Sequence, residues 1–379
     1  MNRQKIDSSL LALARALGWQ RKVDCIVKAY DYERLQKILL HKNIEIKKSY
    51  PFISCYVLSL SGEEISWLSN LTQVGKIYSV CTASAMMNVA KKILNVEGSS
   101  LSGKGVNVAF IDTGLANHVD FCLGEKRIKA FKDFVHGKEK CYDDNGHGTF
   151  VTGVCAGSGV CSGGKYAGVA PKAGIISLKA LSSKGEAGAD KILEAMQWVY
   201  DNHEKENIKV VCMSFGSEPL GYNDPIMSGA EALWKEGVVV VAAAGNSGPE
   251  YQTIKSPGVS NRIITVGGFD DNRLDTNSFD EKFFEVASFS SRGPSFNRFK
   301  PDLVAPSVDI TSCGTNNNYV KLSGTSVATP MVAGLCALLL EENPNLAPND
   351  VKRKILNACH PICFNRNLEG YGYPKLKQN

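Results

Sequence analysis

The segment Val106-Asn107-Val108-Ala109-Phe110-Ile111-Asp112-Thr113-Gly114 decides the fold: an apolar run ends abruptly in a carboxylate and a turn. Comparable runs lie at Gly174–Leu178, Val210–Ser214, Val238–Ala243 and Ile263–Val266, with helix candidates between them at Asp190–Glu204, Ile226–Lys235 and Thr325–Glu341. Nearly continuous apolar strands that alternate with helices indicate an α/β fold, a mostly parallel twisted sheet with helices on both faces. Functional groups gather at the carboxyl ends of such strands, where Asp112, Ser214 and Asn246 follow.

The N-terminal quarter has a different pattern. Strands are expected at Val23–Lys28, Ile44–Tyr50, Phe52–Leu60 and Lys76–Cys81, and helices at Tyr32–His41 and Glu63–Leu71. This β-α-β-β-α-β order predicts a small ferredoxin-like α+β domain. We therefore divide the chain into an N-terminal amphipathic helix (1–21), the small domain (22–82), a linker (83–104) and the large domain (105–379).

The first 21 residues resemble a packed helix more than a secretion signal. Ile6, Leu10, Leu13 and Leu17 share one helical face, and Arg15 interrupts the apolar run. We find no stretch of roughly 18 apolar residues of the kind that spans a membrane. The chain is therefore expected to be cytoplasmic and to have no membrane partner.

Charge and cysteine content narrow the choice of partners and cofactors. The formal net charge is +5 without a basic run, which argues against nucleic acid as a partner. The 12 cysteines are scattered, and many lie in apolar runs as small hydrophobic residues, although an even number leaves a disulfide framework open. The spacing in Cys359-His360-Pro361-Ile362-Cys363 matches no common zinc pattern, so no metal site is predicted.

Four short motifs carry the candidate chemistry. Ser326 precedes a long run of helix formers, where free backbone N–H groups favour a developing negative charge. His147 lies between two glycines, Asp112 ends a buried strand, and Asn246 lies in a glycine-rich turn that can donate to an oxyanion. Each motif alone fits a helix cap, a structural histidine or a turn. Together they supply a nucleophile, a base, an orienting anion and an oxyanion donor.

These motifs resemble those of the subtilisin-like serine proteases, or subtilases. The resemblance rests on Ile111-Asp112-Thr113-Gly114, His147-Gly148-Thr149, Ala244-Gly245-Asn246-Ser247-Gly248 and Gly324-Thr325-Ser326, and covers roughly residues 20–375. Within the family the chain is most similar to the cytoplasmic AprX-like bacterial branch. It departs from the family at Phe150, where a second histidine is usual, and at Val327, where methionine is usual.

The resemblance implies a serine endopeptidase that acts on proteins or peptides. Ser326 would be the nucleophile, His147 the general base and Asp112 its orienting anion, with Asn246 in the oxyanion hole. The substrate-binding residues would be Ser214, Phe215, Gly216, Ala242, Ala243, Ala244 and Gly245. Since no carboxylate is placed there to select Lys or Arg, an apolar or aromatic residue before the cut is expected.

The resemblance also implies that the small domain is an inhibitory prodomain, self-cleaved within Cys81–Asn88. No cofactor is required, and calcium is expected only as a structural ion, with oxygens offered by Asp143-Asp144 and by the stretch from Asp270 to Asp275. Two alternatives stay open at this stage. One is an esterase or peptide ligase that uses the same triad, and the other is a non-catalytic binding protein.

Overall fold

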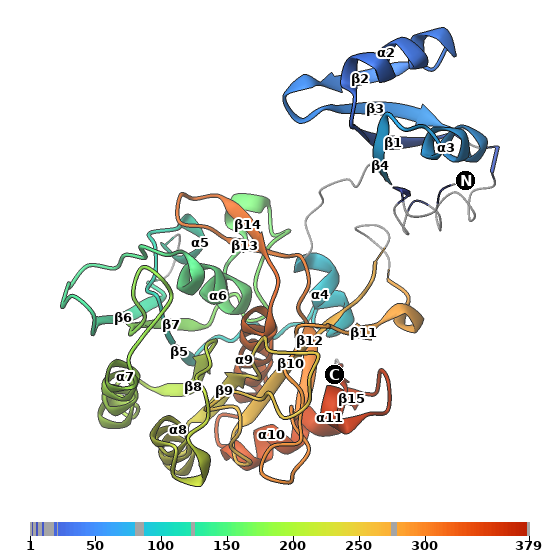
Figure 1. Ribbon diagram of the computed structural model, residues 1–379. Helices are drawn as coiled ribbons and strands as arrows, with labels where there is room; N and C mark the ends of the chain where they lie inside the picture. The colour runs from blue at the N-terminus through green and yellow to red at the C-terminus, as the bar shows by residue number, and fades with distance from the viewer. Residues whose placement is uncertain are drawn as a thin grey trace. The chain divides into compact units, whose positions relative to one another are not determined.

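The computed structural model describes residues 2, 5, 6, 10, 19, 20, 22–79, 87–122, 126–273 and 279–376. The chain forms two compact units, Met1–Ser84 and Ala85–Asn379, which are described separately (Figure 1). Most of the helix expected at 1–21 and residues 81–86 of the expected cleavage segment lie outside the described residues.

Unit 1 has the β-α-β-β-α-β order expected from the sequence. Its elements are β1 (Val23–Ala29), α2 (Tyr32–His41), β2 (Ile46–Tyr50), β3 (Cys55–Leu60), α3 (Gly62–Ser69) and β4 (Val74–Ser79). The four strands form an antiparallel sheet in the order β2-β3-β1-β4. Local signals fix the helix starts, because the Asp31 side chain accepts from Arg34 N, and Ser61 and Glu64 form a capping box.

Unit 2 is built on one eight-stranded sheet, most of whose strand pairs are parallel. The sheet strands are β5 (Asn107–Asp112), β6 (Ile128–Asp133), β7 (Gly174–Lys179), β8 (Ile208–Met213), β9 (Val239–Ala243), β10 (Ile264–Asp270), β11 (Glu285–Val286) and β12 (Leu303–Pro306). The order is β11-β10-β9-β8-β5-β7-β6, with β12 also paired to β10, and only β11 pairs in the antiparallel direction. Every residue of β7 and β9 is buried, as expected for strands covered on both faces.

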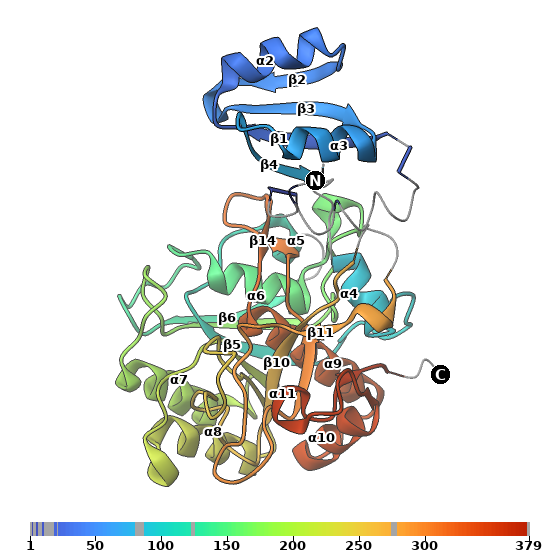
Figure 2. The same ribbon diagram turned by 45° about the vertical axis from the view of Figure 1, so that its right-hand side comes forward.

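Helices cover this sheet in two groups. The helices are α4 (Met87–Ile93), α5 (Val119–Cys122), α6 (His147–Ala156), α7 (Ala189–Asn202), α8 (Pro225–Lys235), α9 (Thr325–Glu342), α10 (Pro348–Asn357) and α11 (Arg366–Glu369). The pair α7 and α8 pack on each other, and α6 packs on α9 (Figures 1 and 2). Two small antiparallel pairs complete the unit: β13 (Ile310–Cys313) with β14 (Tyr319–Leu322), and β15 (Cys359–His360) with β16 (Tyr373–Pro374).

Helix α9 lies in the middle of the core of unit 2. It contacts β8, β9, β10 and β12. By length and composition it is apolar enough to cross a membrane, although no such stretch was expected from the sequence. However, 83% of the helix is buried inside the protein. Its hydrophobicity therefore reflects its place in the core. This position fixes the start of the helix, where Ser326 lies, against the carboxyl end of the sheet.

Candidate active site

Asp112 and His147 are joined directly. Asp112 is the last residue of β5 and its side chain is 2% exposed. Its Oδ1 lies 2.8 Å from His147 Nδ1 and also accepts from Thr113 N at 2.7 Å. Because Nδ1 faces the carboxylate, Nε2 is the ring nitrogen left to act as a base, and the His147 side chain remains 26% exposed.

The sequence analysis placed His147 between two glycines without assigning it to an element, and the structure makes it the first residue of helix α6. Gly146 supplies the turn into the helix with φ 103°. A Cβ on Gly148 would stand 2.3 Å from the Gly114 carbonyl oxygen and 3.2 Å from Asp112 Oδ1. The glycine after His147 therefore allows α6 to approach Asp112 closely.

Asp143 holds this arrangement together, a role that the sequence did not reveal. Its Oδ1 accepts from Thr113 Oγ1, Asn145 N and Gly146 N at 2.9, 3.1 and 2.8 Å. Its Oδ2 accepts from Thr149 N at 2.9 Å and Thr149 Oγ1 at 2.6 Å. One carboxylate thus connects the turn after Asp112 to the first turn of α6.

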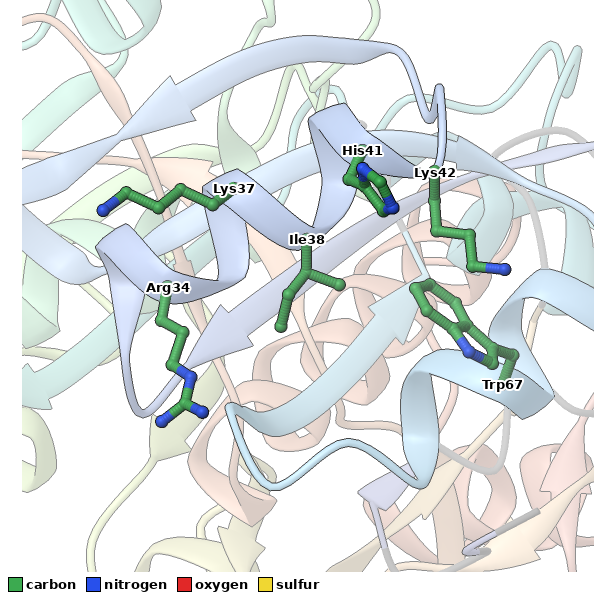
Figure 3. Close-up of a pocket in the computed structure, with 6 residues that line it drawn as sticks. All are labelled: Arg34, Lys37, Ile38, His41, Lys42 and Trp67. Carbon is green, nitrogen blue, oxygen red and sulfur yellow. The ribbon is translucent and has the colours of Figure 1, made fainter.

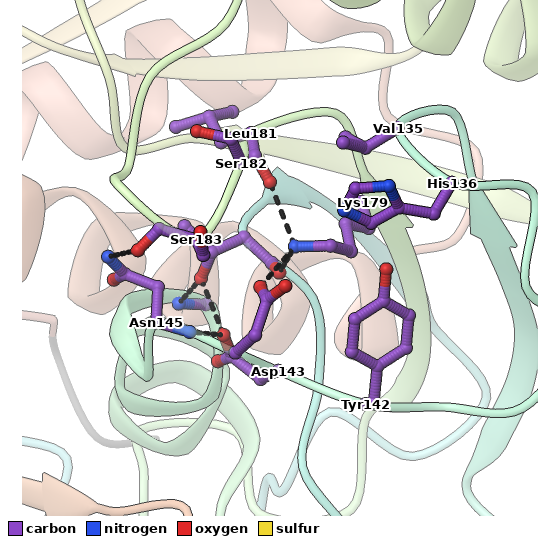
Figure 4. A network of polar contacts seen from close by, with 12 residues as sticks. Val135, His136, Tyr142, Asp143, Asn145, Lys179, Leu181, Ser182 and Ser183 are labelled. Atoms are coloured by element: carbon purple, nitrogen blue, oxygen red, sulfur yellow. Dashed lines mark hydrogen bonds and ion pairs between the residues drawn. The ribbon is translucent and has the colours of Figure 1, made fainter.

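A buried lysine contacts the same turn, and Figure 4 shows its side-chain nitrogen within a network of polar contacts. Lys179, in β7 beside Asp112 of β5, is fully buried, and its Nζ donates to Thr113 O at 2.6 Å and Leu181 O at 3.0 Å. It also pairs with Asp144 Oδ1 at 2.7 Å. Every proton of the ammonium therefore has an acceptor, which a buried charge requires.

The charges around His147 set its proton affinity. Burial lowers the pKa of His147, but the charge of Asp112, the hydrogen bond from Asp112 and the charge of Asp143 outweigh burial and raise that pKa above 6.5. Burial raises the pKa of Asp143, but hydrogen bonds from Thr149, Gly146 and Asn145 hold it below 3.8. Asp143 is therefore an anion at neutral pH and contributes to the field at His147.

Ser326 and Asn246 lie side by side at the start of α9. Both Ser326 Oγ and Asn246 Nδ2 lie within 3.3 Å of the point where a Cβ on Gly324 would stand. Asn246 Oδ1 accepts from Thr325 N at 2.9 Å and from Thr325 Oγ1 at 3.0 Å. These bonds fix the orientation of the amide, so that its N–H₂ group remains available as a donor beside the serine hydroxyl.

The structure brings the two halves of the site onto neighbouring helices. Helices α6 and α9, whose first turns carry His147 and Ser326, pack against each other. Within the described residues the Ser326 hydroxyl makes no hydrogen bond to the His147 ring. Such bonds often tighten only in the complex with substrate.

The predicted substrate residues form two segments, 214–216 and 242–245, which we call the specificity segments. The Ala242, Ala243 and Ala244 side chains are at most 2% exposed and belong to the core. Ala244 and Gly245 use both backbone groups internally, in bonds with Val266, Lys255, Thr325 and Ser291. Of the two segments, only 214–216, with Gly216 exposed, retains a backbone edge that can pair with a substrate strand.

Several of the oxygens considered for calcium accept hydrogen bonds or pair with cations in the part of the chain that the structure describes, whereas Asp271 Oδ2 is buried without a hydrogen-bond partner there. Asp143 accepts N–H and O–H groups, and Asp144 pairs with Lys179, so this pair does not fit a cation. Asp271 pairs with Arg273, and Asp275 lies outside the described residues.

A second buried group, His118 with Asp120 and Cys313, has its ligand atoms within 4.8 Å of one another. Asp120 Oδ2 accepts from Gly159 N and Tyr319 Oη, and Oδ1 accepts from Cys161 N. His118 Nδ1 accepts from Asp120 N, so its other nitrogen carries the proton and faces Asn318 O at 3.1 Å. The His118 nitrogens and both Asp120 oxygens are therefore engaged in hydrogen bonds that a metal ion would have to displace.

Unit 1 has a hollow of its own, between α2 and α3, which contains none of the predicted site residues (Figure 3). Its lining is mostly basic: Arg34, Lys37, Ile38, His41, Lys42 and Trp67. The Lys42 ammonium lies 5.7 Å from the centre of the Trp67 ring. Solvated cations beside one aromatic ring do not form a catalytic constellation.

Comparisons with known proteins identify the family of the chain. The model of the subtilase family (peptidase S8) matches residues 103–374. The serine protease AprX of Bacillus subtilis (strain 168) is 39% identical over 354 residues, which cover 86% of this chain and 78% of that protein. Subtilisin DY of Bacillus licheniformis is 33% identical over 263 residues, covering 69% of this chain and 85% of that protein.

Solved structures extend the agreement to the fold. The S41 psychrophilic protease superposes with a TM-score of 0.67 at 28% identity, covering 78% of this chain and 100% of its own. Sphericase gives a TM-score of 0.65 at 27% identity, covering 76% of this chain and 97% of its own. The subtilisin-like α/β fold and the resemblance to AprX are thereby confirmed, and the chain belongs to the subtilase family of serine endopeptidases.

Proposed function

We propose that this endopeptidase cleaves peptide bonds with Ser326 as nucleophile, His147 as general base and Asp112 as the anion that orients His147. The hydrogen bond of 2.8 Å between Asp112 and His147 carries this assignment, because it leaves Nε2 to act on a hydroxyl. The placement of Ser326 Oγ beside the oriented Asn246 amide supports it.

In the first half of the reaction, Ser326 Oγ attacks the carbonyl carbon while His147 Nε2 takes the hydroxyl proton. The oxyanion that forms accepts hydrogen bonds from Asn246 Nδ2 and from the Ser326 backbone N–H at the start of α9. His147 then gives its proton to the leaving amine as the C–N bond breaks. Water attacks the acyl-enzyme with the help of the same base and restores the serine.

A fluorophosphonate probe tests this assignment in the protein as purified after expression of the whole chain. We expect labelling of the wild type, complete loss in Ser326→Ala, and full retention in the matched control Ser323→Ala, which removes an exposed hydroxyl nearby. Peptide mapping should find the probe on Ser326. Labelling that persists in Ser326→Ala would refute the proposed nucleophile.

We further propose that unit 1 is a prodomain that the enzyme removes from itself and that inhibits the site until then. The boundary between the two compact units falls after Ser84, inside the expected cleavage segment 81–88. Unit 1 also has its own hydrophobic core, which includes Val27, Leu39, Leu58 and Ile77. These features support a detachable domain.

Intact mass spectrometry of purified wild type and Ser326→Ala decides the proposal on processing. We expect the wild type to lose a fragment that ends within 81–88, while Ser326→Ala remains intact. Adding purified unit 1 back to the processed enzyme should then lower its activity. Two intact proteins of full length would refute self-cleavage.

We also propose that the enzyme acts in the cytoplasm and needs no cofactor. The free cysteines of the described part, many of them buried, support a reducing compartment. The reaction uses only groups of the chain, so EDTA should leave turnover unchanged. A structural calcium ion would appear as a rise in Tm on addition of calcium.

A further inference from the structure

A lysine lies between the two specificity segments. A Cβ on Gly216 would stand 2.6 Å from Lys255 Cβ, and a Cβ on Gly245 would stand 2.5 Å from Lys255 Cγ. The aliphatic part of Lys255 therefore lies against the backbone of both segments. Neither glycine can carry a side chain unless the lysine moves.

Backbone bonds fix this position. Lys255 N donates to Ala244 O at 2.9 Å, and Ser217 and Ser256 exchange two bonds of 2.9 Å each. The chain at 254–256 thus connects the end of one specificity segment with the end of the other. The neighbouring Ile254 and Ser256 side chains are buried, so this stretch cannot rotate to move the Lys255 side chain away from the two glycines without exposing Ile254 and Ser256.

The ion pair that the Lys255 ammonium makes is weak. Its side chain is 18% exposed, and its ammonium pairs with Glu218, whose side chain is 81% exposed. A partner so open to solvent contributes little net free energy to the pair. A substrate carboxylate entering between the segments can therefore replace Glu218 at small cost.

We propose that Lys255 determines specificity, so that the enzyme prefers an acidic side chain before the cut. The inference rests on the proposed function, since it assumes that the specificity segments receive that side chain. The stem of Lys255 occupies the space that a large aromatic side chain would need. Its ammonium repels Lys and Arg and attracts the carboxylate of Glu or Asp. This differs from the apolar or aromatic preference expected from the sequence, which considered only acidic side chains in the pocket.

The test is a peptide library that varies the residue before the cut, digested by the protein as purified after expression of the whole chain and read by mass spectrometry. In the wild type we expect Glu to exceed its neutral isostere Gln by about tenfold, which corresponds to ~1.4 kcal/mol. Lys255→Met keeps the length and removes the charge, so the Glu-to-Gln ratio should fall to about one. Lys255→Ala should instead raise cleavage after Phe or Tyr by about tenfold or more, because several methylenes of space are freed.

Two further variants keep the test decisive. Glu218→Gln leaves Lys255 without its anion and should raise the Glu-to-Gln ratio, and its exposure makes misfolding no concern. Lys282→Met, a matched control at a side chain 81% exposed, should give the wild-type profile. A wild-type ratio near one, or a ratio unchanged in Lys255→Met, would overturn the inference and leave the proposed function intact. Absence of both cleavage and fluorophosphonate labelling in the wild type would overturn both.

Discussion

Replacement of Asp143 by asparagine tests whether one carboxylate positions the catalytic base. The substitution Asp143→Asn keeps the shape of the side chain but turns one acceptor oxygen into an N–H₂ donor. If the amide nitrogen took the place of Oδ2, it would face Thr149 N, which donates to that oxygen at 2.9 Å. The opposite orientation would face Gly146 N and Asn145 N. Either way, backbone donors lose their acceptor at the start of α6.

The number of bonds lost sets the size of the effect. A hydrogen bond to a charged acceptor contributes about 1.5–3 kcal/mol, and neighbouring bonds are not additive. We therefore expect Asp143→Asn to lower the free energy of unfolding by about 2–4 kcal/mol, or about 5–10 °C in Tm. The matched control is Asp201→Asn, an exposed carboxylate whose one hydrogen-bond donor among the described residues is Gln197 Nε2 in the same helix, with an expected change below about 0.5 kcal/mol.

The same substitution changes catalysis through charge. Asp143 raises the pKa of His147, and only neutral His147 can take the serine proton. Without that anion the pKa falls, so the acidic limb of the profile of kcat/KM against pH moves to lower pH. Since the pKa of Asp143 itself lies below 3.8, its contribution to stability is complete above that pH. The contribution disappears as pH falls through the depressed value, and the difference in stability between wild type and variant should close there.

Thermal melts measure the loss of stability, and profiles of kcat/KM against pH with a chromogenic peptide measure the shift of the acidic limb. Should Asp143→Asn melt like the Asp201→Asn control and keep the wild-type acidic limb, Asp143 would have no positioning role. A lower Tm with an unchanged limb would leave a structural role only.

Three shorter predictions follow from the same geometry. Asn246→Ala should lower kcat by about 10²–10³-fold with little change in KM, the loss known for such a donor in subtilisin, and stopped-flow or steady-state kinetics with a peptide substrate measures both constants. In the wild type, kcat/KM should rise with pH through an apparent pKa above 6.5, because His147 must lose its proton; a midpoint below 6.5 would contradict the field of Asp112. Burial raises the pKa of the Cys212 thiol well above that of an exposed cysteine, so iodoacetamide should modify exposed cysteines such as Cys122 and leave Cys212 unmodified in the native protein, as peptide mapping would show.

The sequence predicted those parts of the fold that depend on continuous burial. The strands β5, β7, β8 and β9 are buried on both faces, so their apolar runs could be recognised without knowledge of their neighbours. Helix α6 was missed, because His147–Ala156 is rich in glycine and β-branched residues and every residue of the helix after His147 is buried. Packing between α6 and α9 stabilises this helix, and no local preference predicts that.

Some residues of the site could likewise be located from the sequence, and others could not. The positions of Asp112 and Ser326 follow from their elements, the end of a buried strand and the start of a long helix, and both can be located from the sequence. Asp143 was noticed only as a candidate calcium ligand, because its donors combine the segment that follows it, 145–149, with Thr113 from a distant turn. A carboxylate that accepts hydrogen bonds from several N–H groups cannot be distinguished in a sequence from one that binds a cation.

The position of Lys255 could not be predicted from short motifs. The sequence analysis named Gly216 and Gly245 as substrate-binding residues, yet in the structure a lysine from a third segment fills the space beside both of them. A motif indicates which backbone segments a substrate can contact. The side chain that lies between those segments depends on how neighbouring loops pair, here through the two hydrogen bonds between Ser217 and Ser256. Catalytic groups can therefore be identified from short motifs, because chemistry restricts their type and order. Specificity depends on whichever side chain the tertiary structure brings between those motifs, so relatives with the same triad can differ in the residue they prefer before the cut.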